Sequence, residues 1–172
     1  EFPVHERPPH PRSWVEEAAA VAATMDRAGY ERAGIVAGSN GCSAALRLAL
    51  DHPDRVARLL LCWPATAGDP VVDELAAIII ADAHDAAVAS DLLKGSPVRG
   101  VTPAELGTIG VECAVFPSLP ENKIHQRATV IDLVAAIPDA IVVSGSPEPP
   151  DDAFDAFVDS FAAVAAAFAR IE

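Results

Sequence analysis

The chain has 172 residues, of which 51% are hydrophobic, and a formal net charge of −13 at pH 7. This length fits one domain with a substantial buried core. The negative charge, with lysine only at positions 94 and 123, argues against a nucleic-acid partner or an anionic membrane surface. No apolar run approaches the roughly 18 residues that a membrane-spanning helix needs, which excludes such a span.

The start of the chain shows no charged and apolar pattern of a secretory signal. Its three cysteines, Cys42, Cys62 and Cys113, are odd in number and widely spaced. This spacing fits reduced, buried thiols and neither a disulfide framework nor a zinc site. We therefore expect a cytoplasmic protein without a metal ion or other cofactor.

Residues 1–11 are rich in proline and histidine and predict an extended arm, followed by one domain over residues 12–172. Hydrophobic periodicity, caps and turn residues predict the elements of this domain. The expected helices cover residues 14–28, 41–51, 71–93, 124–137 and 152–171, with a short one starting near Thr102, and the expected strands cover residues 33–38, 56–63, 111–116 and 140–143.

Alternating strands and helices predict a three-layer α/β/α sandwich with a mostly parallel sheet. Residues 68–110 interrupt the alternation, because no strand separates the helices expected there. We interpret this segment as a small helical lid over the carboxyl ends of the strands, where open α/β sheets bind ligands.

Residues 35–41, Ile-Val-Ala-Gly-Ser-Asn-Gly, predict a strand that enters a tight turn with Ser39 at its apex. Strand, strained turn and helix form the layout that raises a serine hydroxyl above a parallel sheet for nucleophilic attack. Ala37 and Gly41 flank the serine where strand and helix approach closely, and the backbone N–H of Asn40 would face an oxyanion. The same glycine-rich turn could alternatively hold a nucleotide phosphate, although it has only two of the fingerprint glycines.

The sequence resembles the α/β-hydrolase superfamily at residues 37–41, at the helix and turn over residues 45–56, and at Pro138-Asp139-Ala140. The resemblance covers most of residues 12–172 and places the family's variable cap at residues 68–110. It implies a catalytic acid after the strand before last and a histidine after the last strand. It also implies several strands before the helix that begins near Ser13, one of them followed by a turn that donates an oxyanion N–H.

Two loops depart from this pattern and predict a degenerate triad. The acid loop reads Ser118-Leu119-Pro120-Glu121-Asn122-Lys123-Ile124-His125, with Asn122 at the matching position and Glu121 beside it; the last loop, residues 144–150, holds no histidine. His125 is then the histidine nearest the expected site, and Glu121 could orient a base. Two further alternatives are a weak base at Glu148 and a substitute base at His84 on the lid, although a solvated position suits both residues.

We therefore predict an α/β-hydrolase-fold enzyme that acts on a small apolar ester, lactone or thioester through Ser39, with Asn40, Glu121 and His125 completing the candidate site. Lyase or cyclase chemistry stays open because the expected histidine is missing. The alternative is a non-catalytic binding or scaffold protein that keeps the fold. The strand at residues 33–38 should lie at a sheet edge, covered by an upstream segment or by a second copy of the chain.

Overall fold

The computed structural model describes residues 12–149 and 151–169, so the predicted arm at residues 1–11 lies outside the described residues. Within them, four parallel strands form one sheet in the order β1-β2-β3-β4. The strands are β1 (Ala33–Gly38), β2 (Val56–Cys62), β3 (Glu112–Phe116) and β4 (Ile141–Val142). The predicted parallel sheet and its strand positions are thus confirmed.

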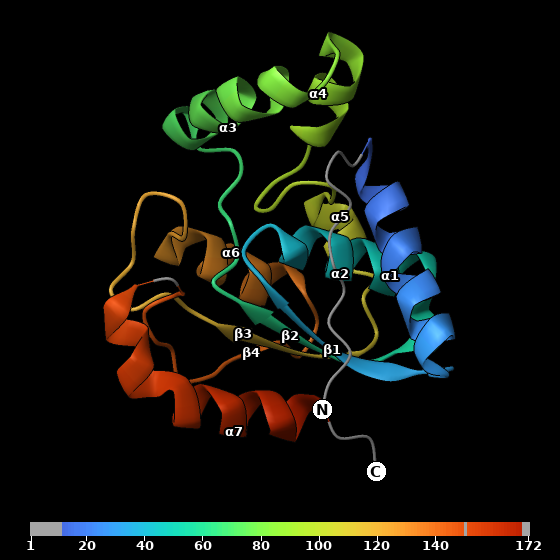
Figure 1. Ribbon diagram of the computed structural model, residues 1–172, viewed down its shortest axis with the longest axis vertical. Helices are drawn as coiled ribbons and strands as arrows, with labels where there is room; N and C mark the ends of the chain where they lie inside the picture. Colours follow the sequence, from blue (N-terminus) through green and yellow to red (C-terminus); the bar gives the residue numbers. More distant parts are fainter. Residues whose placement is uncertain (1–11, 150, 170–172) are drawn as a thin grey trace.

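Helices cover both faces of this sheet and make the expected three layers (Figure 1). α1 packs on α2, and α2 and α6 cover one face, while α7 covers the other face against β1 and β2. The helices are α1 (Trp14–Ala28), α2 (Gly41–Asp51), α3 (Pro70–Ala83), α4 (Ala86–Leu92), α5 (Pro103–Leu106), α6 (Arg127–Ala136) and α7 (Val158–Ala169), with short 3-10 turns at Pro53–Arg55 and Asp152–Phe157.

Alternation along the central strand β2 divides the core into two clusters. Leu59 and Leu61 face the helices α1, α2 and α6, whereas Leu60 and Cys62 face the aromatic side chains of α7. All four are at most 1% exposed, as expected for a strand buried on both faces. The near-continuous apolar run of the sequence therefore fixes β2 at the centre of the sandwich.

Three predicted helices have different bounds in the structure. The helix expected over residues 152–171 starts as a 3-10 helix at Asp152–Phe157 and becomes α7 only at Val158. The other two differ because of polar side chains. The helix expected over residues 71–93 is two helices, because the Asp85 carboxylate accepts the N–H groups of Ala87 and Val88 and starts α4 anew. The helix expected from residue 124 begins only at Arg127, because Asn122 Oδ1 accepts the N–H groups of Ile124 and His125. In both cases a short polar side chain competes successfully for backbone donors.

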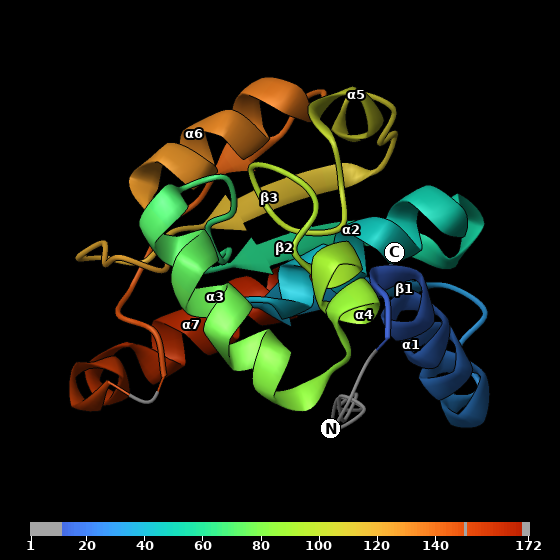
Figure 2. The same cartoon turned by 90° about the horizontal axis from the view of Figure 1, so that it is seen from above.

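α3 and α4 stand apart from the sandwich, beyond the layer that contains α2 and α6 (Figure 1). Seen from above, they lie across the middle of the molecule (Figure 2). In the described part of the chain, no helix is long and apolar enough to cross a membrane.

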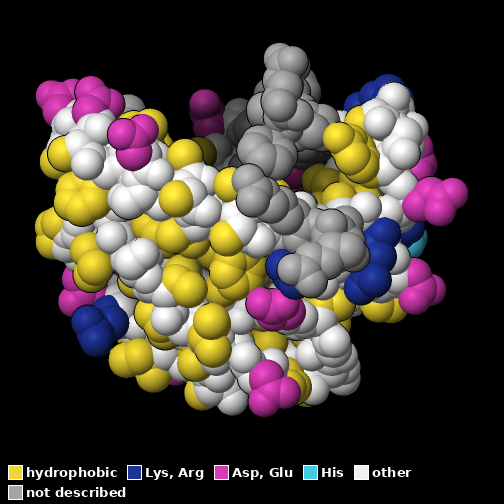
Figure 3. All heavy atoms as spheres, turned by 90° about the horizontal axis from the view of Figure 1, so that it is seen from below, with side chains coloured by type: hydrophobic (Ala, Val, Ile, Leu, Met, Phe, Trp, Pro, Cys, Tyr) yellow, Lys and Arg dark blue, Asp and Glu magenta, His cyan; other side chains and the backbone are white. Residues whose placement is uncertain are grey.

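The close contact between α7 and β1 depends on a glycine. A Cβ on Gly34 would lie 2.9 Å from Ala169 Cα and even closer to the carbonyl oxygen of Phe168. Hydrophobic side chains gather on this face of the molecule, which Figure 3 shows from the side of α7. A helix backbone cannot yield locally as a flexible side chain can, so an added methyl group has to push α7 off the sheet.

We predict that Gly34→Ala lowers the free energy of unfolding by about 1–3 kcal/mol, because the new methyl group overpacks the α7–β1 contact. Chemical denaturation monitored by circular dichroism measures the change. Gly110→Ala is the matched control, since a Cβ there meets nothing within 4 Å. Equal stability of the two variants would show that α7 does not pack on β1 as described.

Candidate active site

Ser39 occupies a strained turn between β1 and α2. Its φ is +53°, in the left-handed region that few residues other than glycine adopt. Its N–H donates to Cys62 O at 2.9 Å, which continues the β1–β2 pairing, and its carbonyl accepts from Cys42 N at 3.1 Å, which begins the helix. At Gly41 an added Cβ would lie 4.0 Å from Ala37 Cβ, an ordinary contact, so backbone strain at Ser39 defines this turn more than close approach does.

The Ser39 hydroxyl meets a histidine. Ser39 Oγ lies 2.9 Å from His125 Nε2, although the two residues are 86 positions apart. His125 comes from the loop between β3 and α6, and its side chain is 10% exposed. A base within hydrogen-bond distance is the first requirement for activating a serine, and the loop after β4 does not supply it.

Glu148 completes a chain of hydrogen bonds behind the histidine. Its Oε1 lies 2.9 Å from His125 Nδ1, and its side chain is 22% exposed. The same carboxylate accepts a hydrogen bond from the Ser118 hydroxyl on Oε2 and another from Asn122 Nδ2 on Oε1. Burial raises the pKa of the Glu148 carboxyl, but the hydrogen bonds from Ser118, His125 and Asn122 outweigh it, so this pKa lies below its ordinary value.

An ionised Glu148 fixes the protonation pattern of the site. A carboxylate without a proton can only accept, so His125 Nδ1 must carry hydrogen and donate to Glu148. In a neutral imidazole, Nε2 is then an acceptor and takes the hydrogen bond from the Ser39 hydroxyl. The arrangement Ser39–His125–Glu148 therefore has the donor directions of a serine, base and orienting acid.

Neighbouring strands bring the two loops together. Beyond β3 and β4 the parallel pairing continues as an isolated bridge between Ser118 and Ser146. Ser146 O accepts hydrogen bonds from Leu119 N at 3.0 Å and from Trp63 Nε1 at 3.1 Å. Trp63 in turn packs edge-on against Phe116 and Phe154, so the loop that carries Glu148 rests on the aromatic core beneath α7.

Of the other candidates of the sequence analysis, only Asn40 lies beside Ser39. The hydrogen bond of Glu121 goes to the start of α6 and not to His125: its Oε2 accepts the N–H of Arg127 at 2.7 Å. His84 ends α3 in the outer layer and is not the residue at Ser39. Asn40 follows Ser39 in the turn as the N-cap of α2, and its side chain makes no cap hydrogen bond.

The sequence predicts a solvated position for Glu148 and places Asn122 where the resemblance implies the catalytic acid. The signal that could have found Glu148 is its position on the loop after β4, beside the loop of His125, because parallel strands end at the same edge of the sheet. The resemblance implies an acid after the strand before last and a histidine after the last strand. In the structure the two are reversed: His125 follows β3 and Glu148 follows β4.

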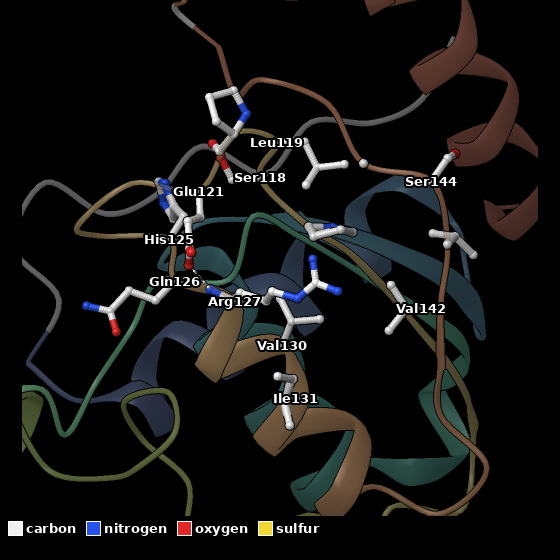
Figure 4. Close-up of a pocket in the computed structure, with 14 residues that line it drawn as sticks. Ser118, Leu119, Glu121, His125, Gln126, Arg127, Val130, Ile131, Val142 and Ser144 are labelled. Carbon is white, nitrogen blue, oxygen red and sulfur yellow. Dashed lines mark hydrogen bonds between the residues drawn. The ribbon is translucent and has the colours of Figure 1, made fainter.

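Two hollows flank this group of residues. A cavity of about 540 Å³ lies beside His125, between the 117–127 segment, α6 and β4, and the Arg127 side chain points into it near Val130 and Val142 (Figure 4). A groove of about 750 Å³ runs along the free edge of β1, between α1 and α7, and reaches Ser39 and Asn40. β1 is therefore an edge strand within the described residues, as expected.

Nearby thiols are not rival nucleophiles. Burial raises the pKa of Cys42 well above its ordinary value and that of Cys62 to about 12. The Cys42 thiol donates to Ala37 O at 3.4 Å and to Cys62 O at 3.5 Å, inside the core beneath the turn. Among the described residues, no group of three or more histidine, cysteine or acidic side chains is arranged to hold a metal ion.

Comparison with known proteins supports the fold. No family model matches the sequence. A 2-hydroxymuconate semialdehyde hydrolase of Pseudomonas putida is 29% identical over 143 residues, which cover 76% of this chain and 49% of that enzyme. The chain thus spans about half the length of this curated relative.

Solved structures agree. A meta-cleavage product hydrolase from Pseudomonas fluorescens superposes with a TM-score of 0.65 at 17% identity, covering 95% of this chain and 74% of that one. An N-acyl homoserine lactone degrading enzyme superposes with a TM-score of 0.63 at 20% identity, covering 91% and 79%. These similarities show that the chain has the α/β-hydrolase fold, as the sequence predicts.

Glu148 makes stability depend on pH. Because its folded-state pKa lies below that of an unfolded glutamate, about 4.3, its contribution is complete above that value and is lost as pH falls through the folded-state pKa. We predict that the free energy of unfolding falls less steeply between about pH 5 and 3 in Glu148→Gln than in the wild type. Urea titrations across this range measure the slope, and Glu74→Gln on the exposed side of α3 is the control. Identical slopes for wild type and Glu148→Gln would contradict the depressed pKa.

Proposed function

We propose that this chain carries the active site of a serine hydrolase, in which Ser39 is the nucleophile, His125 the general base and Glu148 the acid that orients it. The observation that carries the proposal is the unbroken chain of hydrogen bonds from Ser39 Oγ to His125 Nε2 and from His125 Nδ1 to Glu148 Oε1, each 2.9 Å long. A serine hydroxyl becomes a nucleophile at neutral pH when such a base removes its proton during attack.

In the first half-reaction, Ser39 Oγ bonds to the carbonyl carbon of the substrate while its proton passes to His125 Nε2. The electron pair of the carbonyl bond moves onto oxygen, and the N–H of Asn40 stabilises that charge. Glu148 stabilises the imidazolium by accepting from Nδ1 throughout. When the carbonyl re-forms, the bond to the leaving group breaks, and the leaving group takes the proton from Nε2.

In the second half-reaction, water repeats these steps on the acyl-enzyme. His125 takes a proton from the water, the hydroxyl oxygen bonds to the acyl carbon, and Ser39 leaves with the proton that His125 returns. Because a histidine lies within hydrogen-bond distance of Ser39, we favour hydrolysis over lyase or cyclase chemistry.

The substrate we propose is a small molecule with an apolar acyl part joined through an ester, lactone or thioester. Small apolar residues, among them Ala37, Ala44 and Ala45, line the groove that reaches Ser39. The similar proteins named above act on a lactone, on meta-cleavage products and on a muconate semialdehyde, all of them small molecules. The buried, free thiols Cys42, Cys62 and Cys113 support a reducing, cytoplasmic location.

A fluorophosphonate probe tests the nucleophile. We predict stoichiometric labelling, with the adduct on the tryptic peptide that contains Ser39, and no labelling of Ser39→Ala. His125→Gln should slow labelling by about 10³-fold or more, and Glu148→Gln by about 10²–10⁴-fold, because the base is lost or loses its tautomer. Intact-mass spectrometry against time measures the rates.

Matched controls are available for each substitution. Ser160→Ala on α7 and His52→Gln in the turn after α2 should label at the wild-type rate, since both lie away from the elbow. An unmodified wild-type mass after long exposure would contradict the proposal and favour a non-catalytic binding protein. If Glu121→Gln slowed labelling more than Glu148→Gln, Glu121 and not Glu148 would be the orienting acid.

A further inference from the structure

Thr66, in the connection between β2 and α3, holds the backbone on both sides of His125. Its N–H donates to Ile124 O at 2.7 Å, and its Oγ1 accepts from Gln126 N at 3.1 Å. Asn122 Oδ1 accepts the N–H of His125 itself at 3.0 Å. Thr66 and Asn122, both outside α6, therefore hold the backbone by hydrogen bonds directly before His125, at His125 and directly after it.

Burial makes this arrangement rigid. Thr66 is 4% exposed, and Thr129, whose hydroxyl donates to Thr66 Oγ1 at 2.8 Å, is 2% exposed. Hydrogen bonds shielded from water are stronger and are costly to leave unmade. Gln126, the N-cap of α6, has no side-chain cap of its own, so Thr66 Oγ1 takes up a backbone donor at the start of that helix.

The same residue is linked to the outer helices. Thr66 O accepts from Arg99 Nη1 at 3.3 Å, and Arg99 Nη2 donates to Asp73 Oδ1 on α3 at 2.8 Å. The Arg99 side chain is 5% exposed and that of Asp73 is 36% exposed. A path of hydrogen bonds therefore runs from α3 through Arg99 and Thr66 to the peptide groups that flank His125.

We propose that Thr66 is a positioning residue that sets His125 against Ser39 and couples its placement to α3 through Arg99 and Asp73. This inference rests on the proposed role of His125 as the base. Proton transfer depends steeply on donor and acceptor geometry, and displacements of about 1 Å lower rates by about 10²-fold. Neither Thr66 nor Arg99 touches Ser39 in this account; both act through the position of the imidazole.

Thr66→Val tests the positioning role, because valine keeps the shape of the side chain and the backbone N–H but removes Oγ1. We expect the fluorophosphonate labelling rate to fall at least tenfold, and Thr66→Ser, which restores the oxygen, to stay within about threefold of the wild type. In a His125→Gln background the Thr66→Val change should have no further effect on the residual rate, since the residue it positions is gone. A purely structural role would lower both backgrounds alike.

A second pair of variants removes the partner instead of Thr66. Gln126 has φ −84° and ψ 147°, a conformation close to that of proline, so Gln126→Pro deletes the N–H that Thr66 accepts. Gln126→Ala removes the side chain but keeps the N–H. Gln126→Pro should label at least tenfold more slowly than Gln126→Ala, which keeps the proposal testable if Thr66→Val does not fold.

The link to α3 has its own comparison. Asp73→Asn weakens the contact with Arg99 and should slow labelling about threefold to tenfold, whereas Asp82→Asn, exposed on the same helix, should not change it. Wild-type labelling rates in Thr66→Val and Gln126→Pro would overturn the inference while leaving the proposed function intact. Failure of the proposed function would give a different result, an unlabelled wild type. In that case the NMR chemical shifts of the His125 imidazole test the positioning role separately. Unchanged shifts in Thr66→Val would overturn that role.

Discussion

A carboxylate that can only accept hydrogen bonds determines the candidate site. Glu148 receives donors from Ser118, Asn122 and His125, and these interactions hold its pKa below the ordinary value. From this constraint the proton on His125 Nδ1 follows, then the free lone pair on Nε2, and then the direction of the hydrogen bond from Ser39. The turn of Ser39 completes the geometry by lifting its hydroxyl out of the β1–α2 connection, at the expense of a positive φ.

Much of the fold could be predicted from the sequence because local and global signals agree. The apolar run of β2, the capping residue Ser13 and the glycine-rich turn at Ser39 each specify one element without help from distant residues. Predictions failed where a side chain intercepts backbone donors, as Asp85 does at α4 and Asn122 does before α6. Such competition depends on local geometry that hydrophobic periodicity does not reveal.

The site was harder to predict because an acid and a base can exchange loops. The pair His125 and Glu148 needs only adjacent strand ends, and the bridge between Ser118 and Ser146 brings the two loops to the same place. A search for a histidine after the last strand finds none; the sequence points to His125 only as the nearest histidine and leaves Glu148 as a less favoured alternative. The likeness to solved structures supplies the α/β-hydrolase fold, while the order of hydrogen bonds from Ser39 through His125 to Glu148 depends on this chain's own residues.

The tautomer of His125 tests the central claim most directly, because the account requires hydrogen on Nδ1 and a free Nε2. Two-bond proton–nitrogen correlation spectra of protein labelled with nitrogen-15 distinguish the two neutral forms. We predict the Nδ1–H form near neutral pH in the wild type and a mixture of both forms in Glu148→Gln. A wild-type His125 in the Nε2–H form, donating to Ser39, would contradict the account.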